Sequence, residues 1–147
     1  MNFSHNPVML NKVIEGLNIL SNGTYVDCTF GRGGHSKNIL KKIGKKGKLI
    51  AIDKDIEAEN YAKKNFTSDE RFCFEKSNFS NIEFIINKHC KSRKVNGILL
   101  DLGVSSPQLD DPKRGFSFMR EGPIDMRMDI TNKMTALLWL QKADVEE

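Results

Sequence analysis

The chain has 147 residues, a length that fits one domain. Hydrophobic residues make up 39% of it and charged residues 29%, proportions that are ordinary for a globular protein. No apolar run reaches the roughly 18 residues that cross a bilayer, and the N-terminus lacks the basic start and apolar core of a secretory signal. We therefore expect a cytoplasmic protein that has no membrane partner.

Cysteine usage and charge give weaker indications. The three cysteines are an odd number, widely spaced and without a CxxC pair, so they predict reduced thiols and neither a disulfide framework nor a metal site. The net charge of +4 mildly favours a polyanionic partner. Basic residues gather at 41–48 and 88–94, where a solvated helix end explains each cluster, taken alone, more simply than RNA contact does.

Strands and helices are predicted to alternate along most of the chain. Apolar spacing and β-branched residues predict, in chain order, a helix at 7–17, a strand at 24–29, a helix at 35–43, a strand at 48–53, a helix at 56–65, a strand at 71–75, a helix at 80–88 and a strand at 97–101. This alternation predicts an α/β fold with a mainly parallel sheet and right-handed crossovers. The consecutive Leu99 and Leu100 are typical of a strand covered on both faces.

The pattern changes after the last of these strands. Residues 103–131 are rich in glycine, proline and charged side chains, and they predict a long ordered loop. Helical spacing resumes at 135–142, where three leucines recur.

A glycine-rich stretch, 31–34, lies between the first predicted strand and the helix after it. In an open α/β sheet, ligands bind beyond the carboxyl ends of the strands, where glycines let the backbone approach them. Asp53 ends the next predicted strand, and an acidic residue at that place can accept both hydroxyls of a ribose. The combination indicates a cofactor that contains adenosine.

Two residues distinguish between the possible adenosine cofactors. A dinucleotide site requires the pattern GxGxxG, but Ser36 stands where the third glycine should be. Asp27 precedes the loop, and an anion there would repel a pyrophosphate but attract the ammonium and sulfonium of S-adenosylmethionine. Asp27 could instead cap nearby backbone amides. We favour S-adenosylmethionine, with an NAD-dependent oxidoreductase as the rival enzyme class.

Further polar and aromatic residues are placed near the same edge of the sheet. Asp101 and Gln108 follow the fourth predicted strand in a polar run that could hold a ligand or form a serine turn. His35 either lines the methionine end of the cofactor or caps its helix. Phe79 either contacts the adenine ring or belongs to the core.

These residues resemble the bacterial RsmH (MraW) methyltransferases, which modify the N4 amine of a cytosine in small-subunit ribosomal RNA. The stretches that carry the resemblance, in family order, are 5–9, 27–36, 101–110, 114–118 and 123–129. The resemblance implies a Rossmann-like class I methyltransferase sheet with flanking helices, and S-adenosylmethionine as cofactor. It implies that the cofactor contacts are Gly33, Gly34, His35, Asp53, Phe79, Asp101 and Gln108.

Members of the family are about twice as long as this chain. We therefore expect an incomplete fold, in which residues 1–133 form the N-terminal part of the cofactor-binding domain and 134–147 begin a truncated helical insert, with later strands missing. The expected partner is small-subunit ribosomal RNA or the assembling small subunit. The alternative is a remnant that at most binds the cofactor.

Methyl transfer to the cytosine amine requires an unstacked base held in line with the methyl group. Asp101 is the best hydrogen-bond acceptor for the amine in this sequence, and it is the candidate catalytic residue. Arg114, Arg120 and Arg127 could bind RNA phosphates or pair with the carboxylates at 121, 125 and 129.

Overall fold

The computed structural model describes residues 7–90 and 94–144. It divides into two compact units, Met1–Leu102 and Gly103–Glu147, and each unit is described by itself. The sequence predicted a domain boundary between residues 133 and 134, whereas the two units divide after Leu102. The boundary at 133 stays a prediction. No described helix is long and apolar enough to cross a bilayer.

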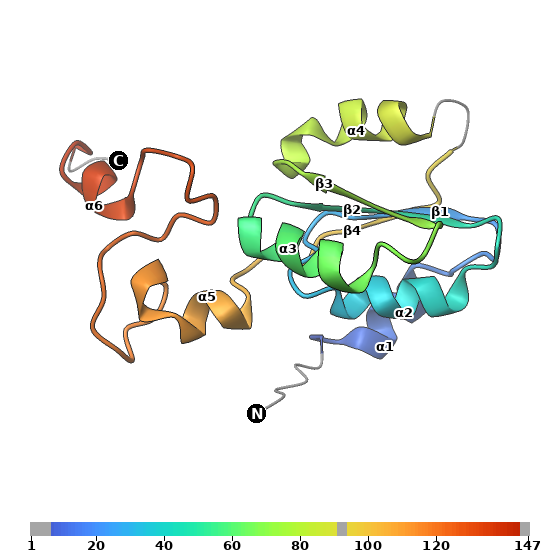
Figure 1. Cartoon of the computed structure of the whole chain (residues 1–147), viewed down its shortest axis with the longest axis horizontal. Helices are drawn as coiled ribbons and strands as arrows, with labels where there is room; N and C mark the ends of the chain where they lie inside the picture. Colours follow the sequence, from blue (N-terminus) through green and yellow to red (C-terminus); the bar gives the residue numbers. More distant parts are fainter. Residues whose placement is uncertain (1–6, 91–93, 145–147) are drawn as a thin grey trace. The chain divides into compact units, whose positions relative to one another are not determined.

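The first unit contains a parallel four-stranded sheet with helices on both faces (Figure 1). The strands lie in the order β3-β2-β1-β4. Their bounds are β1 (Thr24–Asp27), β2 (Lys48–Asp53), β3 (Phe72–Lys76) and β4 (Gly97–Leu99). The helices are α1 (Leu10–Gly16), α2 (Gly34–Lys42), α3 (Ile56–Asn65), the short 3-10 helix η1 (Phe79–Asn81) and α4 (Ile82–His89). The predicted α/β class and the parallel sheet are confirmed.

Alternate residues of the central strands enter two apolar clusters, one on each face of the sheet. Tyr25 and Leu49 belong to the cluster that α1, α2 and α3 cover. Val26 and Ile50 belong to the cluster that α4 covers, with Ile85 buried at its centre. Because β1 and β2 are buried on both faces, their backbone hydrogen bonds are shielded from water, and the carboxyl ends of these strands are fixed in place.

The edge strand β4 differs from the prediction that it is covered on both faces. Leu99 is 8% exposed, whereas Ile98 and Leu100 are 46% and 48% exposed. Helices α1–α3 shield the side that Leu99 enters, but the described residues leave the side chains of Ile98 and Leu100 half in solvent.

The second unit holds two short helices and a 3-10 turn: α5 (Ser106–Asp110), η2 (Pro112–Arg114) and α6 (Ala136–Leu140). The prediction of a long ordered loop at 103–131 was therefore wrong for the residues of α5 and η2. The reason is local capping: the backbone N–H of Ser105 donates to Oε1 of Gln108 at 2.9 Å, which starts α5, and Asp111 caps η2. The capping pattern could have been found in the sequence, because Pro107 stands in the first turn.

Polar contacts rather than an apolar core hold the second unit. Between residues 103 and 144 the side chains classed as buried are Gln108 and Arg114. The Nη2 atom of Arg114 donates to the carbonyl oxygens of Arg127 and Met128, at 3.1 and 3.2 Å. Arg127 in turn forms a double hydrogen bond with the Asp125 carboxylate, at 2.8 and 2.6 Å. Buried hydrogen bonds to a guanidinium therefore define the conformation of this unit.

We expect the exposed edge strand β4 to make this 147-residue chain prone to self-association, because an uncovered strand is a template for another chain. We expect Ile98→Lys to reduce aggregation, since a lysine on an edge strand opposes pairing of two such edges. The cost in stability should be small, because Ile98 is 46% exposed. Light scattering over a concentration series would measure the effect. Ile50→Lys, at a buried position, should instead unfold the protein. Equal aggregation of wild type and Ile98→Lys would contradict the prediction.

Candidate functional site

The glycine loop follows β1 and leads directly into α2. Gly31 and Gly33 have φ values of +54° and +68°, in the left-handed region that favours glycine. A Cβ atom on Gly33 would lie 2.5 Å from Cζ of Phe66, so this glycine also permits close packing. A Cβ atom on Gly31 would have no neighbour within 4 Å. The loop is thus packed against the core at Gly33 and borders open space at Gly31.

Asp53 joins this loop to the end of β2. Its Oδ2 accepts the backbone N–H of Gly31 at 2.8 Å, and its Oδ1 accepts the backbone N–H of Asp55 at 3.0 Å. Burial raises the pKa of the Asp53 carboxyl, and these two hydrogen bonds oppose that rise. A carboxylate oxygen can accept more than one hydrogen bond, so Asp53 retains acceptor capacity toward a ligand.

Asp27 lies at the end of β1 and is 1% exposed. Its Oδ2 accepts the hydroxyl of Ser36 at 2.7 Å, and its Oδ1 accepts the backbone N–H of Thr29 at 3.2 Å. Burial raises its pKa, and these hydrogen bonds lower it in part. The contact with the Thr29 amide fits the alternative that Asp27 caps nearby backbone, and a contact with a cofactor stays a prediction.

His35 and Asp101 face each other at the carboxyl ends of β1 and β4. His35 is 5% exposed, and its Nε2 lies 3.3 Å from Oδ2 of Asp101. The orientation does not meet hydrogen-bond geometry, so neither ring nitrogen has a hydrogen-bond partner among the described residues. A buried polar nitrogen without a partner is costly, and a ligand that supplies one would stabilise this arrangement. The backbone N–H of Asp101 is fixed by Oγ1 of Thr29 at 2.8 Å.

Phe79, Gly34 and Gln108 are the remaining residues predicted to contact the cofactor. Phe79 lies in η1, 39% exposed and outside both core clusters, so its ring is accessible to a ligand. Gly34 begins α2 beside His35, where a Cβ atom would lie 2.4 Å from Cγ of Pro7. Gln108 belongs to the second unit, where it caps α5.

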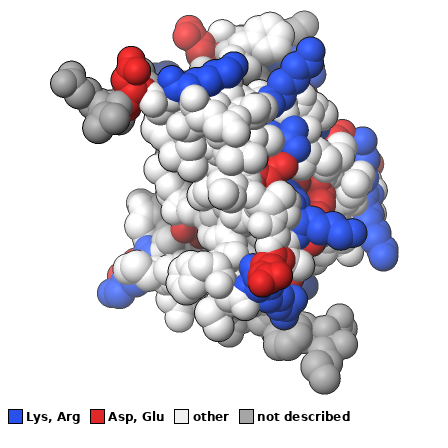
Figure 2. All heavy atoms as spheres, turned by 90° about the vertical axis from the view of Figure 1, so that its left-hand side faces the viewer, with Lys and Arg blue, Asp and Glu red and all other residues white. Residues whose placement is uncertain are grey.

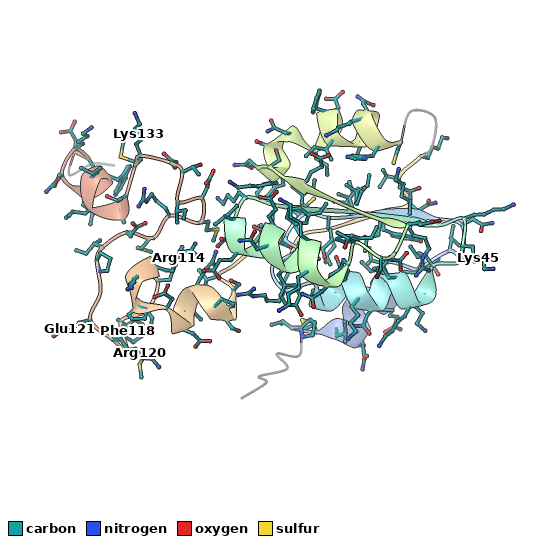
Figure 3. The ribbon with its side chains drawn as sticks, in the orientation of Figure 1. Lys45, Arg114, Phe118, Arg120, Glu121 and Lys133 are labelled. Atoms are coloured by element: carbon teal, nitrogen blue, oxygen red, sulfur yellow. The ribbon has the colours of Figure 1, made fainter. Side chains whose placement is uncertain are left out.

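The arginines of the second unit divide between structural and exposed positions. Arg114 and Arg127 bind backbone carbonyls, and Arg127 also pairs with Asp125. For Arg127, pairing with a carboxylate was the alternative to binding an RNA phosphate. Arg120 is exposed, and its Nη1 donates to the carbonyl oxygen of Asp110 at 3.0 Å. Figure 3 shows Arg114 inside the unit and Arg120 at a turn.

The sequence did not predict three contacts that shape the site. The Arg32 side chain, inside the glycine loop, reaches Oε2 of Glu57 at 3.1 Å and lies over the ring of Tyr61 at 5.2 Å. Thr29 holds the backbone of Asp101. No local sequence pattern predicts the contact of Thr29 with Asp101, because the two residues are 72 positions apart.

Three carboxylates therefore meet at the carboxyl edge of the sheet, on β1, β2 and the segment after β4. Asp27 and Asp53 have pKa values raised by burial, so a bound cation or a set of hydroxyl donors would relieve their desolvation. Among the described residues, no group of three or more histidines, cysteines or acidic residues could hold a metal ion. The arrangement fits an organic ligand that carries positive charge and ribose hydroxyls.

A parallel α/β sheet with a glycine loop after its first strand and an acid at the end of its second defines a protein that binds a nucleoside cofactor. The chain belongs to the MraW methylase family, whose family model matches residues 2–147. The recognition of this family in the sequence is confirmed.

Known proteins similar to this chain include two bacterial relatives and one solved structure. The "Ribosomal RNA small subunit methyltransferase H" of Ruthia magnifica subsp. Calyptogena magnifica is 55% identical over 97% of this chain and 46% of its own length. That of Shewanella frigidimarina is 50% identical over 99% of this chain and 46% of its own length. An rRNA methylase from Streptococcus thermophilus shares the fold, with a TM-score of 0.51 and 16% identity, over 69% of this chain and 57% of its own. The chain thus spans about half the length of the curated relatives it matches.

Replacing Asp53 should weaken the binding of S-adenosylmethionine. Asp53→Ala removes an acceptor for ribose hydroxyls and also releases the Gly31 amide, so we expect a loss of about 1–3 kcal/mol in binding free energy. Asp53→Asn, which keeps one carbonyl oxygen, should lose less. Asp69→Ala is the matched control, because Asp69 pairs with Arg71 at the start of β3. Calorimetry would measure all four affinities, and equal values for wild type and Asp53→Ala would refute the assignment.

Replacing Asp27 should raise the stability of the fold and weaken the binding of S-adenosylmethionine. Because burial raises its pKa, the stability that Asp27 contributes is present when it is protonated and is lost as pH rises through the folded-state pKa. We therefore expect Asp27→Asn to be more stable than wild type in urea at pH 7, and this advantage to shrink as pH falls toward about 4. The same variant should bind S-adenosylmethionine more weakly, by about 10-fold. It should lose less affinity for the demethylated product, which keeps the ammonium but has an uncharged thioether in place of the sulfonium. An equal loss for both ligands would show that Asp27 does not respond to the sulfonium.

Proposed function

We propose that this chain is the cofactor-binding part of an S-adenosylmethionine-dependent methyltransferase that acts on small-subunit ribosomal RNA in the cytoplasm, at the N4 amine of a cytosine. Family membership and the names of the relatives support methylation of ribosomal RNA. The observation that carries the proposal is the meeting of three carboxylates beside the glycine loop with the buried His35, whose ring nitrogens make no hydrogen bond to the described residues. The choice of the cytosine amine rests on the family resemblance of the motifs at 101–110 and 123–129.

The residues at this edge fit S-adenosylmethionine. The cofactor carries an ammonium, a sulfonium and two ribose hydroxyls, and the edge offers the carboxylates of Asp27, Asp53 and Asp101. The backbone beside Gly31 borders open space, which lets a ligand approach it. The buried nitrogens of His35 need a polar partner. Asp53 would hold the ribose, and Asp27 and His35 would face the methionine end.

The same geometry disfavours the NAD alternative. Ser36, at the place of the third glycine, donates its hydroxyl to the buried carboxylate of Asp27. A pyrophosphate at the start of α2 would therefore lie near a buried anion, and like charges repel strongly where water is excluded.

In the reaction, the bound cofactor supplies an electrophilic methyl group. The protein must hold the cytosine amine in line with it, which is a task of positioning. The Asp101 carboxylate, 44% exposed and fixed through its backbone by Thr29, is the group best placed to accept hydrogen bonds from the amine and to take the proton that N4 must lose. His35, at 3.3 Å, limits the orientations of that carboxylate.

A labelling experiment tests this function. Undermethylated small ribosomal subunits, incubated with methyl-labelled cofactor and the Shewanella frigidimarina relative, should acquire label on cytosine N4 of the RNA, as read by nucleoside mass spectrometry. Label confined to protein, or to another position of the RNA, would contradict the proposal.

The 147-residue chain should bind the cofactor but turn over at least about 100-fold more slowly than the relative, because small errors in substrate position reduce rate steeply. Calorimetry on the chain and its rate on the same subunits would measure the two properties separately. Comparable turnover would show that residues 1–147 suffice for substrate positioning.

A further inference from the structure

The loop between η2 and α6 presents apolar side chains to solvent. Phe118 is 98% exposed and Met119 is 80% exposed, the two highest values among the large hydrophobic residues described. Figure 3 shows Phe118 together with Arg120 and Glu121 at one turn of this loop. An almost fully exposed phenylalanine contributes almost no burial energy to the fold, so folding of this unit gives no reason for it.

Close backbone contacts nevertheless fix the base of this loop. A Cβ atom on Gly122 would lie 2.0 Å from the carbonyl oxygen of Pro112, and one on Gly115 would lie 2.2 Å from the carbonyl oxygen of Pro123. Arg120 donates from Nη1 to the carbonyl oxygen of Asp110 at 3.0 Å, across ten residues. The loop is therefore held at its base while its tip buries nothing. Fixing an aromatic side chain before binding lowers the entropy lost on association.

Net charge does not explain how this unit would bind RNA. Residues 103–147 contain six Lys or Arg and eight Asp or Glu. In Figure 2, basic and acidic side chains lie interspersed on the face drawn. Binding by long-range attraction is therefore excluded as the main contribution here, and an RNA contact must come from local chemistry. An aromatic ring with a guanidinium two residues away is that chemistry, because bases stack on aromatic rings and Arg binds phosphate.

We propose that Phe118 is a stacking platform for an unpaired base of ribosomal RNA, and that Arg120 binds the phosphate next to that base. The proposal rests on the proposed function, since a target cytosine must be unstacked to react. Every base has a flat π-face, so the platform is not selective by itself, and the expected ligand is single-stranded RNA.

Phe84 provides a matched comparison. It is 71% exposed and lies on α4 of the first unit, beside the acidic Glu83 rather than a basic residue. Phe84 is thus an ordinary surface residue of a regular helix. Phe84→Ala therefore removes the same side chain from a regular helix, on which the nearby cation, Lys88, is already paired with Glu75.

The test measures binding of a fluorescent single-stranded RNA of about 12 nucleotides to the 147-residue chain at low salt, by anisotropy. Phe118→Ala should weaken binding about 10-fold, and Phe118→Trp should restore it. Phe118→Leu should not restore it, because leucine keeps the apolar surface but cannot stack. A plot of log affinity against log salt has a negative slope. Arg120→Gln should make that slope less steep by about 0.7, the value for one phosphate on a single strand. Phe84→Ala should bind as wild type does.

The outcomes separate this inference from the proposed function. Unchanged affinity of Phe118→Ala, with wild-type binding intact, would overturn the stacking role and leave the methyltransferase proposal standing. Rescue by Phe118→Leu, or a fall in melting temperature that matches the loss of affinity, would show that Phe118 contacts protein and would also overturn it. The methyltransferase proposal fails instead if the relative does not label ribosomal RNA. Affinity for S-adenosylmethionine should stay the same in all these variants.

Discussion

The hydrogen bond from the Gly31 amide to the Asp53 carboxylate is the contact on which the candidate site depends. It joins the loop after β1 to the end of β2, across 22 residues. Gly31 adopts a positive φ in this loop, and Asp53 is in turn held by the Asp55 amide. The loop has this shape because a buried carboxylate needs donors, and the loop supplies one. The start of α2, with His35 and Ser36, is positioned as a consequence.

The two units are stabilised by different forces. The first has apolar clusters on both faces of its sheet, which shield β1 and β2 from water. The second has a buried guanidinium, Arg114, bound to carbonyl oxygens 13 and 14 residues further along the chain. Removing one partner from a buried charged hydrogen bond costs more than removing one apolar contact. The second unit therefore depends on a few specific residues, whereas the first distributes its stability over many.

Much of the first unit could be predicted because its signals are local. The strand at 48–53 and the helix at 56–65 were predicted with the bounds that the structure has. The first helix begins later than predicted, at Leu10, because Met9 adopts a left-handed conformation that no composition rule indicates. The helix α5 was missed although Ser105 and Gln108 form a recognisable cap, since glycines and prolines around it favoured a loop.

The site was predictable in part. Asp27, His35, Asp53 and Asp101 were expected at one edge, because the carboxyl ends of parallel strands meet there, and the structure places them there. Their partners were not predictable. The bond from Asp101 to Thr29 and the contact of Arg32 with Glu57 join residues far apart in sequence. Which side chains meet across such distances is decided by packing, which periodicity does not encode.

The strand order also has a consequence for the sequence of folding events. Strands β1, β2 and β3 are neighbours both in the chain and in the sheet, so they can pair as soon as residues up to Lys76 are available. Strand β4 pairs with β1 across a separation of 72 residues, with Tyr25 opposite Gly97. Closing so long a loop costs entropy before any contact repays it. During synthesis, when N-terminal segments fold first, β1 would wait with one side open. Asp101, which follows β4, would then reach the site after Asp27 and Asp53. The three carboxylates would therefore come together only after β1, β2 and β3 have paired.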